Sequence, residues 1–184
     1  MGGGRPSSRA AGRQSYQTLL VSPSPMSREP LRLLADGMLG RLAKWLRLLG
    51  YDTAYDNADD DLGLARRARA EKRVLLTRDR ELAQRRGLRA ILVRSQALAE
   101  QVRQVREELG PPPGPALSRC TLCNAALRPA APTDVEGRVP PYVLETYPEF
   151  QRCPSCGRIY WPGSHVSSMR NQIDAFCGEG PADD

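Results

Sequence analysis

The chain has 184 residues, of which 40% are hydrophobic and 26% are charged, and its formal net charge is +6. This balance is that of a globular protein, and the length suits one ordinary domain plus a small one. No apolar run approaches the roughly 20 residues of a membrane-spanning helix, which excludes an integral membrane protein. The excess of arginine suggests polyanionic partners without specifying which.

Residues 1–29 are rich in Gly, Ser, Pro and Arg and show little hydrophobic pattern. They lack the continuous apolar core of a signal peptide. We therefore expect a disordered N-terminal extension on a cytoplasmic protein. An organelle transit peptide is the alternative interpretation, because no acidic residue precedes Glu29.

Residues 30–110 alternate short apolar runs with amphipathic segments. Between residues 37 and 50, leucines recur at steps of three and four, which gives a helix one apolar face. The alternation predicts an α/β domain with a parallel sheet and flanking helices. We expect strands over 31–35, 51–55, 73–77 and 89–93, and helices over 37–50, 59–72, 79–87 and 95–110.

The proline-rich run PPPGP within residues 111–118 predicts a linker to a second, smaller domain. We place this domain, with a C-terminal helix, over residues 119–176. Residues 177–184 are expected to form a disordered tail.

Two C-x-x-C pairs lie in the small domain, Cys120 with Cys123 and Cys153 with Cys156. Each pair can place two sulfurs on one metal ion, and four thiolates complete the closed tetrahedral shell of a structural zinc. Gly157 follows the second pair and permits the positive φ that such a turn needs. Disulfides or a redox pair are the alternatives, but disulfides need an oxidising compartment and a redox motif needs one pair only.

Aspartates follow the predicted strands of the larger domain. Asp36 comes directly after the first strand, Asp79 lies two residues beyond the third, and the run Asp59, Asp60, Asp61 opens the second helix. In a parallel sheet with right-handed crossovers these positions share one edge. Clustered carboxylates suit Mg²⁺ or Mn²⁺. As an alternative, each aspartate caps or opens a helix.

Basic residues form a second pattern near these acids. Arg41, Lys44 and Arg47 repeat every three residues on the first helix, opposite the leucines. We interpret this stripe as a track for a phosphate backbone, and the alternative is a solvated helix face. Thr77 and Arg78 border Asp79 and are candidates to steady a metal ligand or a phosphate.

The segment after the second cysteine pair is aromatic and basic. Tyr160 and Trp161, with Arg158 and Arg170, either contact single-stranded nucleic acid or cover the metal site, and packing is the favoured interpretation for Trp161. His165 is the single histidine; it is a fifth candidate ligand or a structural side chain.

These segments together resemble the Mut-seven C-terminal ribonuclease family over about residues 31–170. The resemblance rests on LLADGMLGRLAKWLRLLGYDTAYDN, DDD, RVLLTRDREL and the two C-x-x-C pairs with CGRIYWPGSH, which occur in this order. It implies a PIN-like, Rossmann-like nuclease domain fused to a zinc ribbon.

By position, the resemblance assigns Asp36, Asp79 and one of Asp59 and Asp60 to the catalytic metal site, with Asp60 taken as the catalytic member. It implies a Mg²⁺- or Mn²⁺-dependent ribonuclease that hydrolyses RNA, tRNA or ribosomal RNA among the candidates, with the ribbon aiding RNA binding. The fourth acid of many PIN domains has no counterpart in RAILVRSQ. The alternatives are a non-catalytic RNA- or ribosome-binding protein and a protein-binding adaptor.

Overall fold

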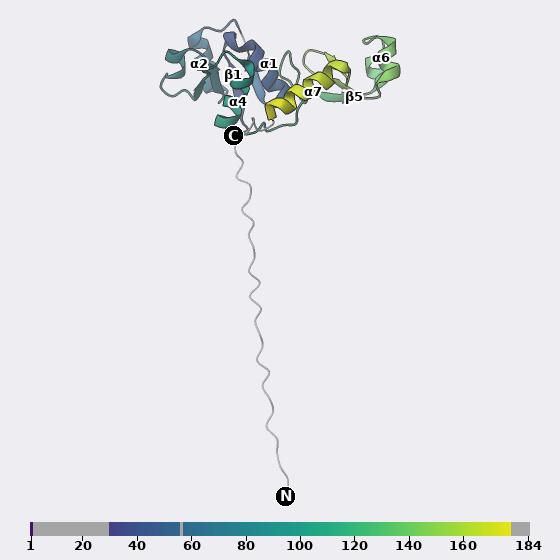
Figure 1. Ribbon diagram of the computed structural model, residues 1–184, viewed down its shortest axis with the longest axis horizontal. Helices are drawn as coiled ribbons and strands as arrows, with labels where there is room; N and C mark the ends of the chain where they lie inside the picture. Colours follow the sequence, from purple (N-terminus) through teal and green to yellow (C-terminus); the bar gives the residue numbers. More distant parts are fainter. Residues whose placement is uncertain (2–29, 56, 178–184) are drawn as a thin grey trace, which may run out of the picture.

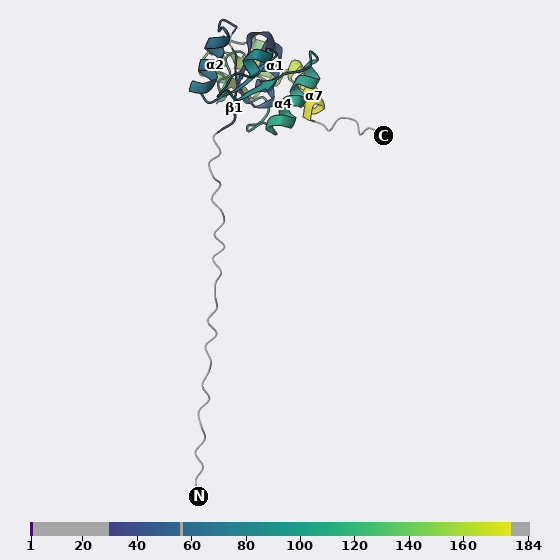
Figure 2. The same cartoon turned by 90° about the vertical axis from the view of Figure 1, so that its left-hand side faces the viewer.

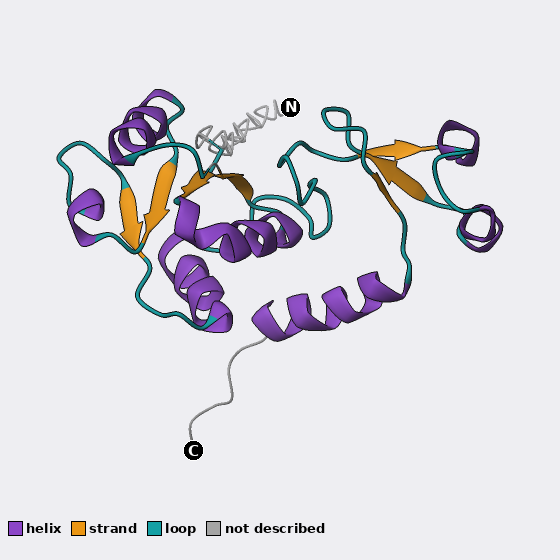
Figure 3. Cartoon of the chain, turned by 90° about the horizontal axis from the view of Figure 1, so that it is seen from above, coloured by secondary structure: helices purple, strands orange, loops and turns teal. Residues whose placement is uncertain are grey.

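The structure, a computed structural model, describes residue 1, residues 30–55 and residues 57–177. The predictions for residues 2–29 and 178–184 therefore lie outside the described residues. An α/β domain and a smaller C-terminal domain lie side by side, and helix α7 (Ser164–Cys177) extends from the small domain to the large one (Figures 1 and 3).

The larger domain is built on a four-stranded parallel sheet with the strand order β2-β1-β3-β4. This confirms the predicted α/β class. The chain leaves β1 towards β2 on one side and later adds β3 on the other, so the strand order reverses between β1 and β3. The strands are β1 (Arg32–Ala35), β2 (Asp52–Tyr55), β3 (Val74–Thr77) and β4 (Ala90–Leu92).

Helices cover both faces of this sheet (Figures 1 and 2). Alternate residues of β1 point to opposite faces, so Leu33 packs in one hydrophobic cluster with α1 and α4, whereas Leu34 packs in another with α2. The helical elements are η1 (Gly37–Leu39), α1 (Gly40–Leu49), α2 (Asp61–Ala70), α3 (Arg80–Ala83) and α4 (Leu98–Leu109).

Helix α1 ends at Gly50, and the linker passes directly over this end. Gly50 has a φ of 106°, and a Cβ on it would lie 2.2 Å from the carbonyl oxygen of Gly114. The amide of Leu117 then donates to the carbonyl of Leu48 at 2.7 Å. The last turn of α1 is therefore buried by the linker as well as by the sheet.

The smaller domain contains a three-stranded antiparallel sheet, β5-β6-β7, and its own apolar cluster around Val135, Val143 and Phe150. Two short helices in its proline-rich segment were not predicted, and each begins with proline at its first helical position. The elements are β5 (Arg128–Ala130), α5 (Pro132–Val135), α6 (Pro141–Thr146), β6 (Phe150–Arg152) and β7 (Ile159–Tyr160).

Helix α7 packs on the larger domain rather than on the small domain that precedes it. Ile173 belongs to the hydrophobic cluster of α1 and α4. Phe176 meets Trp45 edge to face with ring centroids 5.1 Å apart, and its carbonyl accepts from Arg106 Nη1. In the described part of the chain, no helix combines the length and apolarity that crossing a bilayer requires.

Arg47 is buried between the two domains, and the prediction that it lines a solvent-facing basic stripe is wrong. The residue is 4% exposed. Its Nε donates to the carbonyl of Thr53 at 2.8 Å, and its Nη1 donates to those of Thr121 at 3.0 Å and Leu122 at 2.9 Å. The turn of the first cysteine pair covers it. Arg41 and Lys44 are exposed, as the stripe requires.

Asp52 is a second junction between the domains. Its Oδ1 accepts from Arg73 Nη1 at 2.6 Å and from Asn124 Nδ2 at 2.8 Å, and its Oδ2 lies 3.6 Å from Arg119 Nη1. The Oδ1 of Asn124 accepts from the amide of Thr53 at 2.9 Å. The small domain therefore satisfies polar groups on the outer edge of β2, which an open sheet would leave exposed.

We expect Arg47→Ala to lower the free energy of unfolding by about 3 kcal/mol, because three buried carbonyl groups lose a charged donor. Denaturant titration of the zinc-loaded protein measures this change. Arg41→Ala, an exposed position on the same helix, is the matched control. Equal stability of the two variants would contradict the structural role of Arg47.

We also expect acid to destabilise the fold through two carboxylates, Asp52 at the domain junction and Glu71 within the larger domain. Burial raises the pKa of Asp52, but hydrogen bonds from Arg73 and Asn124 outweigh it and lower the pKa below its ordinary value. The hydrogen bond with Arg73 lowers the pKa of Glu71. Both carboxylates therefore stabilise the fold above their unfolded pKa values near 4, and this contribution is lost as pH falls through the lower folded values.

The measurement is the melting temperature below about pH 4 for wild type and for Asp52→Asn. Acid also releases zinc by protonating the thiolates, but this happens at a pH above the measured range and affects both proteins alike. We expect a shallower slope in the variant, and parallel curves would show that Asp52 does not carry the acid sensitivity.

Candidate zinc centre and carboxylate edge

The four cysteines converge in the small domain. In the described residues they are the one group of three or more potential metal ligands whose ligand atoms all lie within 4.8 Å of one another. The Sγ atoms of Cys120 and Cys156 are 3.5 Å apart, and those of Cys123 and Cys153 are 3.3 Å apart. Tetrahedral zinc with Zn–S bonds of about 2.3 Å needs sulfurs about 3.8 Å apart, so the residues fit the ion.

The backbone of each pair forms the turn that the ion requires. The amide of Cys123 points at Cys120 Sγ at 3.5 Å, and that of Cys156 points at Cys153 Sγ at 3.4 Å. Gly157 has a φ of 73°, as predicted from the sequence, and Asn124 takes the corresponding position after the first pair with a φ of 69°.

The thiols have opposed pKa shifts because they are crowded together. Burial raises the pKa of Cys120, but hydrogen bonds with Tyr160 and with backbone amides lower it to about 6. Burial and the bond to Cys120 raise the pKa of Tyr160 to about 12, so its hydroxyl stays a donor. A backbone hydrogen bond lowers the pKa of Cys156, but burial and the neighbouring thiols raise it to about 12. Four thiolates in this space need a cation, and four cysteines so clustered can hold a structural metal such as zinc.

Asp36 lies at the carboxyl end of β1, at the point where the strand order reverses. Open α/β sheets bind their ligands in the crevice that forms at this point, beyond the carboxyl ends of the strands. The residue is 9% exposed. Although it precedes η1, its side chain makes no capping hydrogen bond, so the alternative interpretation as a helix cap does not hold for Asp36.

Thr77 joins Asp36 to Asp79. The buried Thr77 hydroxyl donates to Asp36 Oδ2 at 2.6 Å and accepts from the backbone amide of Asp79 at 3.0 Å. Asp79 also caps α3 through Oδ1, which accepts from the amide of Leu82 at 2.8 Å. The Thr77 hydroxyl therefore contacts Asp36, a candidate metal ligand, and the role of Thr77 in steadying a metal ligand or a phosphate stays a prediction.

The acids beyond β2 lie at the same sheet edge but are engaged locally. Asp60 caps α2 by accepting from the amide of Gly63 at 2.7 Å. Asp59 lies 3.5 Å from Arg67, and Asp61 lies 3.9 Å from Arg85. The three expected catalytic carboxylates do not form a preassembled metal-ligand group within the described residues.

Mg²⁺ keeps several waters and is often held by one or two carboxylates together with substrate phosphates. Asp36 and Asp79 are the candidates for such a pair: the Thr77 hydroxyl contacts the carboxylate of Asp36 and the backbone amide of Asp79. Arg41 and Arg78 are exposed at the beginning of the helices that follow β1 and β3.

Sequence reasoning missed the residues that connect the two domains. Asp52 and Asn124 were not candidates, Arg47 was assigned to solvent, and the hydrogen bond from Tyr160 to the cysteine turn was not expected. One signal was available for Arg47: it precedes Leu48, Leu49 and Gly50, so the last turn of the helix is apolar all round except for this arginine. The side chain of His165 lies outside the described residues.

We expect the purified protein to contain one zinc ion per chain. Cys153→Ser should lose the ion and the native packing of the small domain, since Cys153 is fully buried. Elemental analysis and thiol titration with and without a chelator measure both changes. A metal-free wild-type protein with its two cysteine pairs oxidised to disulfides would contradict the assignment.

Comparison with known protein families gives one finding for this chain. The family model described as the Mut7-C RNAse domain matches residues 31–173, which span β1, the carboxylate edge, both cysteine pairs and most of α7. Comparisons with curated proteins and with solved structures give no match. The chain belongs to the Mut7-C RNAse domain family.

Proposed function

We propose that the protein is a ribonuclease that hydrolyses RNA phosphodiester bonds at the carboxylate edge with Mg²⁺ or Mn²⁺. Membership of an RNAse domain family indicates a ribonuclease-type function. The observation that carries the assignment to this edge is the buried Asp36 carboxylate, which caps no helix and is held by Thr77 at the crevice. Buried charged groups are as a rule paired with an opposite charge or bound to a metal ion.

In this proposal Asp36 and Asp79 hold the divalent ion. Such an ion polarises the scissile phosphate and lowers the pKa of a bound water. Thr77 fixes the orientation of Asp36, because its hydroxyl is itself anchored by the Asp79 amide. Asp59 and Asp60 lie on the loop that follows β2, the strand next to β1. From there they would orient the attacking water.

The exposed basic residues would hold the RNA beside this edge. Arg41 and Lys44 stand three residues apart and so share one face of α1, and Arg78 directly precedes Asp79. Their contacts would be with phosphates, which give affinity without sequence preference.

A non-catalytic RNA-binding protein is the second candidate. The capping bonds of Asp60 and Asp79 favour it, because both carboxylates already have structural partners. In that case, the buried Asp36 would contribute to folding alone.

We expect RNA cleavage that requires Mg²⁺ or Mn²⁺ and stops with EDTA. Asp36→Asn should slow it by about 1000-fold, since several kcal/mol of metal-dependent stabilisation are lost. Asp174→Asn, an exposed aspartate on α7, is the control with the same chemical change. RNA bound equally by all three proteins and cut by none would favour the second candidate.

Thr77→Val should reduce cleavage by about 10- to 100-fold, because outer hydrogen bonds to metal ligands have effects of this size. The expected mark of a positioning role is a higher Mn²⁺ concentration at half-maximal activity, with RNA affinity unchanged. An unchanged metal dependence would show that Thr77 acts on stability only.

A further inference from the structure

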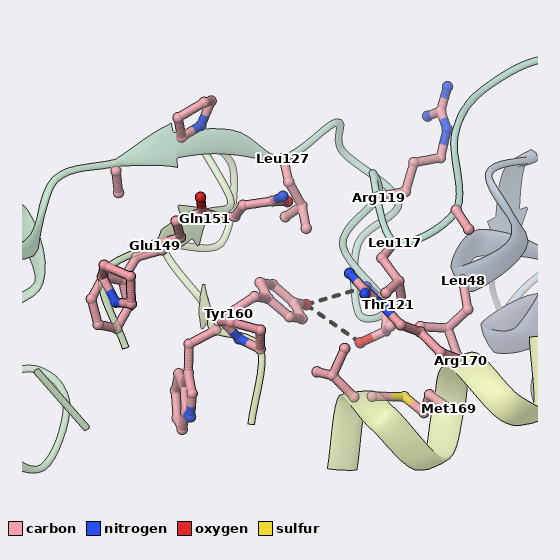
Figure 4. A pocket seen from close by; sticks show the side chains of 18 of the residues that line it. Leu48, Leu117, Arg119, Thr121, Leu127, Glu149, Gln151, Tyr160, Met169 and Arg170 are labelled. Carbon is pink, nitrogen blue, oxygen red and sulfur yellow. Dashed lines mark hydrogen bonds between the residues drawn. The ribbon is translucent and has the colours of Figure 1, made fainter. Parts of the chain in front are cut away.

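A cleft of about 720 Å³ separates the small sheet from α1 and α7. Figure 4 shows its two walls, with Gln151 and Tyr160 of the small sheet facing Leu48, Leu117 and Met169. The cleft lies outside the carboxylate edge, and none of the four candidate zinc ligands lines it.

The charged side chains of the cleft are mostly cationic. Lys44, Arg119 and Arg170 line it, and Glu149 is the one carboxylate among the lining residues. Lys44 and Arg170 are exposed, and no ion pair involving either is found among the described residues. Arg119 is partly engaged by Asp52 at 3.6 Å. The unpaired cations suit a polyanion better than they suit an apolar peptide.

The cleft also presents aromatic rings with fixed positions. Tyr160 lines it, and its hydroxyl is held 3.1 Å from Cys120 Sγ and accepts from the Thr121 amide at 3.2 Å. Trp161 lines the same wall and packs partly on the core of the small domain. Fixed aromatic rings beside unpaired cations are the combination that binds single-stranded nucleic acid, because bases stack while phosphates contact the cations.

We propose that this cleft binds a single-stranded segment of RNA and leads it to the carboxylate edge. The identity of the polyanion as RNA rests on the proposed function. Helix α1 begins at the carboxylate edge with Gly40, and Lys44 lies about 6 Å further along its axis. Arg41 lies between them on the same face as Lys44. One backbone can thus contact the cleft, Lys44, Arg41 and the acids in succession. Duplex RNA presents stacked bases and is recognised by its groove shape, so the cleft should select single strands.

The test measures the affinity of the zinc-loaded protein for a fluorescent oligouridylate by anisotropy, in EDTA-free buffer with Ca²⁺ in place of Mg²⁺. Lys44→Ala and Arg170→Ala should each weaken binding roughly fivefold and reduce the slope of log K against log salt by about 0.7. Arg103→Ala, an exposed arginine on α4 outside the cleft, is the control for charge. A self-complementary RNA duplex of equal length should bind more weakly than the single strand.

Tryptophan fluorescence gives an independent readout. In a Trp45→Phe background Trp161 is the one remaining tryptophan, and oligouridylate should quench it. If Lys44→Ala and Arg170→Ala bind the single strand with the same affinity as Arg103→Ala, the proposal is overturned. A protein segment would then be the remaining occupant of the cleft. Equal affinity for the duplex would overturn it as well.

These outcomes are separable from those of the proposed function. If no protein cuts RNA but both cleft variants bind it weakly, the proposed RNA site in the cleft is kept and the proposed hydrolysis is rejected. If wild type cuts RNA in a metal-dependent way and the cleft variants bind RNA normally, the proposed hydrolysis is kept and the RNA site in the cleft is rejected.

Discussion

The buried guanidinium of Arg47 is the interaction on which the arrangement of the two domains depends. A charge at 4% exposure is tolerated only with a full set of partners, and here the partners are three carbonyl oxygens from two separate segments. Burial lowers the pKa of Arg47, while the nearby Cys120 and Cys123 raise it. Four thiolates around a Zn²⁺ ion would carry two net negative charges, and this arginine would offset part of them. With a metal ion bound, the stability of this centre and the docking of the two domains would be linked through Arg47.

The same junction explains how the outer edge of β2 has its backbone polar groups satisfied in a sheet of four strands. Thr53 presents its amide and carbonyl outwards, and Asn124 and Arg47 satisfy them. The carboxyl ends of the strands are arranged differently. There the strand order reverses between β1 and β3, and the Thr77 hydroxyl contacts both the Asp36 carboxylate and the Asp79 amide. The small domain therefore covers the side of the sheet at β2, while the carboxyl ends of β1 and β3, which carry the carboxylates, stay uncovered by it.

Local patterns in the sequence predicted the strands and the longer helices of the larger domain, because leucine spacing and short apolar runs report the period of each element; the helix expected over 79–87 is only Arg80–Ala83. The cysteine spacing predicted the convergence of four sulfurs, because two C-x-x-C turns can complete one tetrahedral metal shell. The contacts across the junction could not be predicted in this way. Arg47 and Thr121 are 74 positions apart, and periodicity on α1 cannot show that a distant turn covers it. Helix α7 was expected from the sequence, but its packing on α1 and α4 depends on Ile173 and Phe176 meeting a surface made earlier in the chain. At the acids, chain topology predicted a shared edge but not the capping bonds that hold Asp60 and Asp79.

In the proposed function, the position of the small domain limits how one RNA strand can contact both this domain and the carboxylate edge. Its contacts with Asp52 and Thr53 lie at the amino end of β2, whereas Asp36 and Asp79 lie beyond the carboxyl ends of β1 and β3. A strand of four residues is about 13 Å long, so the zinc ligands are too distant to take part in chemistry at the acids. Helix α1 runs between these ends, from Gly40 beside the acids to the buried turn under the linker. Its solvent face carries Arg41 and Lys44, and its buried face carries the leucines and Arg47. In the proposed function, this one helix therefore fixes the distance between the basic residues that hold the RNA and the carboxylates.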